Sequence, residues 1–277
     1  MNHLYPFLLT LFLLCASCEE VPPVVNPIVD SNPIDTTRQR VLVEEFTGTR
    51  CVNCPAGSAE LARLQKIYGD RMVIVAIHAG SFARPYPESR VDFRTPAGDA
   101  LLDFLGQPLG YPSAVISRKQ FAGEFDLQLS RSLWPVYLQQ ELELPARIAL
   151  NLRVSYEPTS RALSLGTDLT MLAETETPED LRLSVMVVED SIAEYQLTPD
   201  GLDPAYIHRH NLRDMLTAAT GNSLPDDWST GQTISRNYTY SLPIGWKETD
   251  VSLVALVHRT GGVKEVWEVT QIDLIDD

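Results

Sequence analysis

Two cysteines separated by two residues, Cys51 and Cys54, are the part of this sequence whose types and spacing could do chemistry. They follow an apolar run, Val41 to Phe46, and precede a run with helical spacing that starts near Ser58. A thiol at the start of a helix faces unpaired backbone N–H groups and the positive end of the helix dipole, which favour its thiolate form. Cys51 is therefore the best candidate for a nucleophile near neutral pH.

The remaining cysteines, Cys15 and Cys18, lie at the end of an apolar amino-terminal segment. The run from Leu4 to Ala16 carries no charged residue and would cover only about 20 Å as a helix, too little for a bilayer core. It is typical of a secretory signal. The small residues directly before Cys18 resemble the lipobox of bacterial lipoproteins, in which the cysteine is lipidated and becomes the mature amino terminus. We expect residues 1–17 to be removed and Cys18 to anchor the protein in a membrane; a plain secretory signal or a buried helix is the alternative.

After this processing the chain would keep a single pair, Cys51 and Cys54. A lone pair two residues apart cannot form the disulfide framework of a small stapled fold, and it excludes a four-cysteine metal site. In an oxidising compartment the pair would be either a redox centre or an inert disulfide that locks the start of a helix. The sequence leaves both readings open.

Residues 18–40 contain four prolines and little periodicity, which predicts an extended tether with a reach of about 60 Å. The chain carries a net charge of −15. Such an acidic balance argues against nucleic acid or anionic lipid surfaces as partners, and it favours solubility close to a membrane.

The hydrophobic pattern changes character near residue 145. From 41 to 144, apolar strands alternate with helical segments in β-α-β order, and the continuous apolar run Met72 to His78 is typical of a strand covered on both faces. From 145 to 277 apolar residues alternate with a period of two, and Gly261 and Gly262 indicate a tight hairpin near the end. The sequence predicts an α/β domain at 41–144 followed by an all-β, sandwich-like domain at 145–277.

The first of these domains resembles the thioredoxin fold. Cys51-Val-Asn-Cys54-Pro follows its first core strand, and the segment around Tyr111-Pro112-Ser113 looks like the cis-proline loop that faces the cysteine pair in that family. The resemblance implies that Cys51 attacks a substrate disulfide, Cys54 resolves the mixed disulfide, and Pro112 shapes the substrate groove. Glu45 holds the position of the buried acid of thioredoxins and would accept the proton of Cys54. Val-Asn replaces the family's Gly-Pro between the cysteines, which leaves the direction of exchange open.

Nearly the whole mature sequence is similar to a family of gram-negative outer-membrane lipoproteins of about 28 kDa, whose members are named for location and not for a reaction. The similarity rests on the lipid signal, the Pro-rich tether, the stretch from Glu44 to Pro55, Tyr-Pro-Ser, and Ile207-His-Arg-His-Asn-Leu-Arg213. It implies a lipid-anchored protein at the outer membrane, with the periplasmic or exterior face undetermined.

Two further groups of residues could form sites. His208 and His210 could bind a metal if a third ligand existed, but none is placed by spacing, so we expect no metal and a structural role. Trp228, Trp246 and Trp267 could form a binding platform but are more typical of a core. We found no motif for a cofactor. The predicted activity is thiol–disulfide exchange on exported proteins; the alternative is a non-enzymatic surface protein that binds a partner or host ligand and keeps a structural disulfide.

Overall fold

The computed structural model describes residues 28–30, 36–172 and 180–275. The fold is β-rich, which confirms the coarser part of the predicted fold class. The predicted signal peptide and Cys18 lie outside the described residues. Two residues of the expected tether form a short strand, β1 (Val29–Asp30), which pairs with a strand of the second half.

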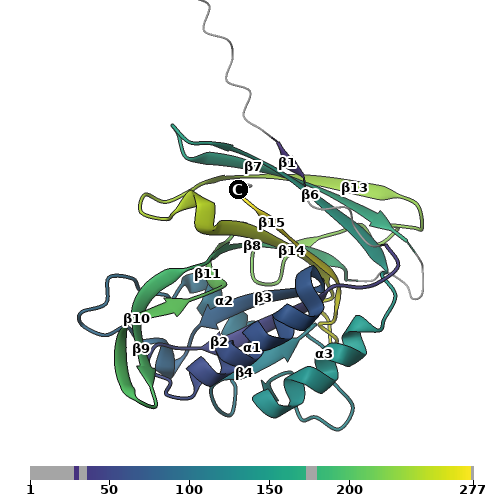
Figure 1. Cartoon of the computed structure of the whole chain (residues 1–277). Helices are drawn as coiled ribbons and strands as arrows, with labels where there is room; N and C mark the ends of the chain where they lie inside the picture. Colours follow the sequence, from purple (N-terminus) through teal and green to yellow (C-terminus); the bar gives the residue numbers. More distant parts are fainter. Residues whose placement is uncertain (1–27, 31–35, 173–179, 276–277) are drawn as a thin grey trace, which may run out of the picture.

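The first half builds three layers around two parallel strands. β2 (Val41–Thr47) and β3 (Met72–His78) pair in parallel and are buried at every residue. Helix α1 (Cys54–Tyr68) joins them and lies across them in Figure 1. It packs on one face together with α3 (Trp134–Leu142), whereas α2 (Pro96–Leu105) packs on the other.

Two short strands complete the outer side of this half. β4 (Ser113–Ile116) runs antiparallel to β2, and β5 (Leu129–Ser130) pairs with β4. Helix α3 starts at Trp134, and Pro135 fits its first turn, where no backbone N–H is needed.

The second half consists of antiparallel strands, as its period of two predicted. β6, β7 and β13 form a small sheet with β1, and β9 pairs with β10 as a separate hairpin. The remaining strands, β8, β11, β12, β14 and β15, belong to a larger sheet. The bounds are β6 (Ile148–Glu157), β7 (Ala162–Met171), β8 (Arg182–Glu189), β9 (Ile192–Thr198), β10 (Gly201–His208), β11 (Asn211–Met215), β12 (Asn222–Ser223), β13 (Thr233–Ser241), β14 (Val251–His258) and β15 (Val266–Asp273).

The larger sheet joins the two halves of the chain. Its order is β15-β14-β8-β11-β3-β2-β4-β5, so β11 connects strands from before and after residue 145. Asn211 pairs in parallel with Ala76 of β3 and antiparallel with Glu189 of β8. One face of β8, β14 and β15 packs against the small sheet in a shared core. The halves are therefore hydrogen-bonded neighbours in one sheet; the domain boundary near residue 145 stays a prediction.

Candidate functional site

The cysteine pair lies at the start of α1, as the spacing predicted. Cys54 is the first residue of the helix, Pro55 follows it, and Cys51 lies in the preceding turn, where its N–H donates to the Gly48 carbonyl. The two cysteines form a disulfide. Both are buried, with Cys51 only 3% exposed and Cys54 only 1% exposed.

Pro112 and Glu45 converge on the first turn of α1. The Tyr111–Pro112 peptide bond is cis, which confirms that prediction. A Cβ at Gly57 would lie 2.8 Å from Cγ of Pro112 and 2.8 Å from Oε1 of Glu45. Gly57 therefore allows α1 to approach both residues, since a larger side chain would clash with both. In the sequence, only the spacing Cys54-Pro-Ala-Gly57 could have suggested this role for Gly57.

Glu45 is buried beneath the helix without a counter-charge. Its Oε1 has no hydrogen-bond partner, and its Oε2 lies 3.5 Å from Oγ of Ser58. Burial raises the pKa of Glu45 to about 8, and the Ser58 hydrogen bond opposes this only in part. The carboxyl is therefore protonated at neutral pH and can exchange a proton slightly above it.

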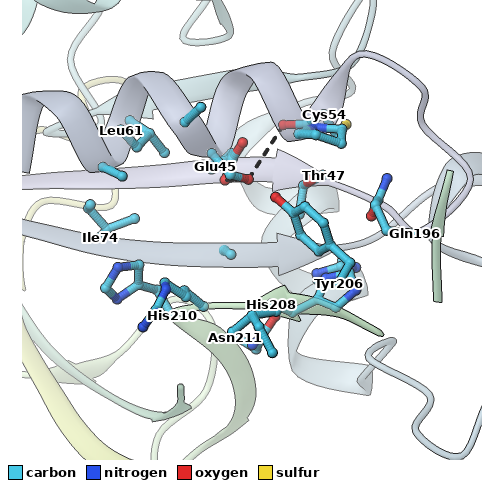
Figure 2. A pocket seen from close by; sticks show the side chains of 18 of the residues that line it. Glu45, Thr47, Cys54, Leu61, Ile74, Gln196, Tyr206, His208, His210 and Asn211 are labelled. Atoms are coloured by element: carbon cyan, nitrogen blue, oxygen red, sulfur yellow. Dashed lines mark hydrogen bonds between the residues drawn. The ribbon is translucent and has the colours of Figure 1, made fainter. Parts of the chain in front are cut away.

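A cavity of about 390 Å³ opens beside this carboxyl. Its wall includes Cys54 and Glu45 from the first half and Tyr206 and His208 from β10 (Figure 2). Burial lowers the pKa of His208 to about 4, so its ring is neutral at pH 7. No cluster of His, Cys, Asp or Glu that could hold a metal ion occurs among the described residues.

The β9–β10 hairpin is hydrogen-bonded to the backbone of the turn that carries Cys51. Nε2 of Gln196 donates to the Cys51 carbonyl at 3.0 Å and to the Gly48 carbonyl at 3.4 Å. The N–H of Leu197 donates to the Thr49 carbonyl at 2.8 Å. Sequence reasoning missed Gln196 and Tyr206, because they come from the far half of the chain and carry no local signal of a site.

Arg50, which precedes the pair, is engaged elsewhere. Its guanidinium donates to the carbonyls of Arg84 and Pro85, each at 2.8 Å, and lies 4.3 Å from the ring centroid of Tyr86. It fixes the loop beside the cysteines. The structure therefore favours a positioning role for Arg50 over a role as a charge that activates the thiol of Cys51.

The histidines and tryptophans of the second half have structural surroundings. The ring centroids of His208 and Phe93 lie 4.6 Å apart, and Nδ1 of His210 lies 3.4 Å from Oδ2 of Asp190. Trp228 and Trp267 are core residues, and Trp246 packs against the same core. His258 is buried beside Arg118.

Comparison with known proteins places the chain in a family. The family model described as Outer membrane protein Omp28 matches residues 107–276. The chain belongs to the Omp28 family. This confirms the predicted family and the outer membrane as its location. Among the helices of the described residues, none has the length and apolar content that a bilayer crossing needs.

Solved structures resemble this Omp28-family chain in fold. HBP35 of Porphyromonas gingivalis is 18% identical with a TM-score of 0.68, over 86% of this chain and 76% of that one. AGR_C_4864 of Agrobacterium tumefaciens is 11% identical with a TM-score of 0.54, over 86% and 95%. A domain of the outer membrane lipoprotein Omp28 from P. gingivalis is 17% identical over 47% and 88%, with a TM-score of only 0.32. No curated protein matches the sequence.

Proposed function

We propose that this Omp28-family protein performs thiol–disulfide exchange on exported proteins through Cys51 and Cys54, in a thioredoxin-like first half. The observation that carries the proposal is the buried carboxyl of Glu45, which borders the same cavity as Cys54 and titrates near pH 8. A raised carboxyl pKa next to a disulfide at a helix start fits a group that takes up and releases the proton of a resolving thiol. The cis Pro112 supports the same reading.

The exchange would proceed in two steps when the pair is reduced. The Cys51 thiolate attacks one sulfur of a substrate disulfide, which breaks the substrate S–S bond and releases one substrate thiolate. In the molecules whose Glu45 is ionised, a fraction that grows as the pH approaches 8, Cys54 then gives its proton to the Glu45 carboxylate and attacks the Cys51 sulfur, which releases the second substrate thiolate. Two electrons pass from the pair to the substrate, and the Cys51–Cys54 disulfide remains.

The cover over Cys51 sets a condition on this activity. Because Cys51 is only 3% exposed, a substrate reaches its sulfur only after neighbouring residues move. We propose that the moving part is the β9–β10 hairpin, which Gln196 and Leu197 hold against the backbone of residues 48–51. The same burial favours the second candidate function, a non-enzymatic surface protein that binds a partner and uses the disulfide as a structural lock. Its ligand would contact parts of the protein other than the cysteine pair.

Cysteine variants separate the two candidates. The reduced protein is mixed with oxidised glutathione, and the products are resolved by mass spectrometry. Cys51→Ser should abolish exchange, whereas Cys54→Ser should accumulate a mixed disulfide with glutathione, because attack is intact and resolution is not. The structural reading takes over if the wild type does not react and the Cys54→Ser variant forms no mixed disulfide.

We also propose that a lipid on Cys18 anchors the protein, with the folded part carried clear of the outer membrane. Cys18→Ala should move the protein from the membrane pellet to the soluble fraction after cell lysis. A high-salt wash of the wild type serves as the control, since a lipid anchor resists salt whereas a charge contact does not. Retention of the variant in the washed pellet would refute the anchor.

A further inference from the structure

The cavity of about 390 Å³ beside Glu45 lies between the two halves of the chain. Leu61 of α1 and Ile74 of β3 give it an apolar side, and β10 contributes Tyr206 (Figure 2). The Tyr206 side chain is half-buried, and its hydroxyl points toward the strand that carries Glu45. A concave, largely apolar space with a few polar groups is the usual form of a small-molecule site.

Part of the cavity wall carries buried polar atoms without a partner. Oδ1 of Asn211 and Nδ1 of His78 form no hydrogen bond with any of the described residues. Nδ2 of Asn211 donates to the Glu189 carbonyl at 3.1 Å, which fixes the end of the amide that is the oxygen. Because buried polar side-chain atoms are mostly hydrogen-bonded in folded proteins, these two atoms mark a place for a molecule from solution.

The titratable groups of the wall are neutral at pH 7. Burial raises the pKa of Glu45 to about 8. Burial lowers the pKa of each histidine of the wall, His78, His208 and His210. Arg209 is exposed and pairs with Asp190 at 3.0 Å. A charged molecule would lose its hydration in this cavity without gaining a counter-charge, so an uncharged molecule is favoured.

Aromatic rings form one side of the wall. The ring centroids of Tyr206 and His208 lie 4.9 Å apart, and those of His208 and His78 lie 5.5 Å apart. Phe93 supports both imidazoles, with its centroid 4.6 Å from each. A flat ring fits such a wall, because aromatic groups stack or meet edge to face at separations of this kind.

We propose that this cavity binds a small uncharged aromatic molecule, which packs against Tyr206 and His208 and donates an N–H or O–H group to Oδ1 of Asn211. Indoles and phenols have this chemistry. The inference goes beyond thiol–disulfide exchange, since it needs no reactive cysteine and applies to the protein with its disulfide closed. A bound molecule would also connect β10 to α1 and β3.

A blocking variant tests the place of binding. Ala62 is an exposed residue of α1 that borders the cavity, so the side chain of Ala62→Trp would occupy its opening. Ala56→Trp is the matched control, at an exposed position of the same helix that does not line the cavity. The oxidised proteins are titrated with indole in a calorimeter. Wild type and Ala56→Trp should bind with the same Kd, and Ala62→Trp about tenfold or more weakly, because the ring can no longer be buried.

A pair of probes tests the hydrogen bond to Asn211. Benzothiophene has nearly the shape of indole but no N–H group. The ratio of the Kd of benzothiophene to that of indole is measured in the wild type and in Asn211→Leu, whose side chain has a similar size and accepts no hydrogen bond. The ratio should fall about fivefold in the variant, which corresponds to the loss of one ordinary hydrogen bond.

Three results would overturn the inference. The cavity takes up only water if neither probe binds the wild type. Equal binding of indole to Ala62→Trp and Ala56→Trp would place the probe elsewhere, and an unchanged ratio in Asn211→Leu would exclude the hydrogen bond. Ala62→Trp changes only an exposed position, so it decides the question even if Asn211→Leu does not fold. None of these results depends on exchange, which the glutathione assay tests separately.

Discussion

At the scale of single residues, the site is defined by a carboxyl that is buried without a cation. Among the four predicted residues, Cys51 and Cys54 form a disulfide, and Glu45 and Pro112 meet at Gly57 of the same helix. Their convergence was predictable because strand, turn and helix follow one another within a short stretch of sequence. Only Pro112 comes from a distant loop, and there the sequence Tyr-Pro-Ser indicated its position.

Glu45→Gln should remove part of the pH dependence of stability. Burial raises the folded-state pKa of Glu45 from 4.5 to about 8. Between these values the unfolded carboxyl is ionised and the folded one is protonated, so the free energy of unfolding falls as pH rises from about 5 to 8. The loss is on the order of 4 kcal/mol, and urea denaturation at pH 5 and pH 8 should show that the variant avoids it.

Glu268→Gln provides the matched control for this prediction. Glu268 is equally buried, and desolvation also raises its pKa to about 8, but it lies on β15, away from the cysteines. The Glu268→Gln variant should change the pH dependence of stability in the same direction as Glu45→Gln does. It should leave the pH profile of exchange at its wild-type shape. If the stability of the Glu45→Gln variant still falls with rising pH as in the wild type, the raised pKa of Glu45 is contradicted.

At the scale of elements, we expect the β9–β10 hairpin to control access to the site. Its strands have mostly exposed or half-buried residues, so from the sequence they resemble an ordinary solvated hairpin. Glu194, Gln196 and His208 are the exceptions, since all three are buried, and the carboxylate of Glu194 accepts from the backbone N–H groups of Arg90 and Val91 at 2.7 and 2.9 Å. No local pattern could show that this hairpin lies over Cys51, because its position depends on strand pairing elsewhere.

Gln196→Ala should speed reduction of the disulfide. The variant loses the bonds from Nε2 to the Gly48 and Cys51 carbonyls, which weakens the cover over the sulfur. Loss of about one net hydrogen bond corresponds to roughly a fivefold higher rate of reduction by dithiothreitol. Leu202→Ala, at an exposed position of β10, should react like the wild type. Equal rates for all three proteins would show that the hairpin does not limit access.

At the scale of the whole molecule, a buried ion pair of the first half contacts a histidine of the second half. Arg118, which follows β4, forms two hydrogen bonds with Glu44 of β2, at 2.7 and 2.9 Å, and both side chains have no exposed surface. Nη1 of Arg118 also lies 3.3 Å from Nδ1 of His258 on β14, and Ser184 of β8 meets the other ring nitrogen at 2.8 Å. The change in periodicity at residue 145 indicated two kinds of structure, but periodicity cannot show which strands from each half become neighbours.

Arg118→Ala should destabilise the protein strongly, by about 3–5 kcal/mol, because it leaves the Glu44 carboxylate buried without a cation. Arg153→Ala is the comparison. The side chain of Arg153 pairs with Asp168 but is 45% exposed, so its loss should lower the free energy of unfolding by at most about 1 kcal/mol. Chemical denaturation at pH 7 measures both. Similar losses for the two variants would contradict the importance of the buried pair.

The position of β11 between β8 and β3 has a consequence for how the protein is exported. During secretion the chain emerges from its amino terminus, so β3 reaches the periplasm long before β11, its partner on that edge. Until then the mostly apolar strand Met72–His78 has an open edge, which is a template for pairing with other chains. We therefore expect that the newly exported protein needs holding factors to protect this edge until Asn211 reaches Ala76.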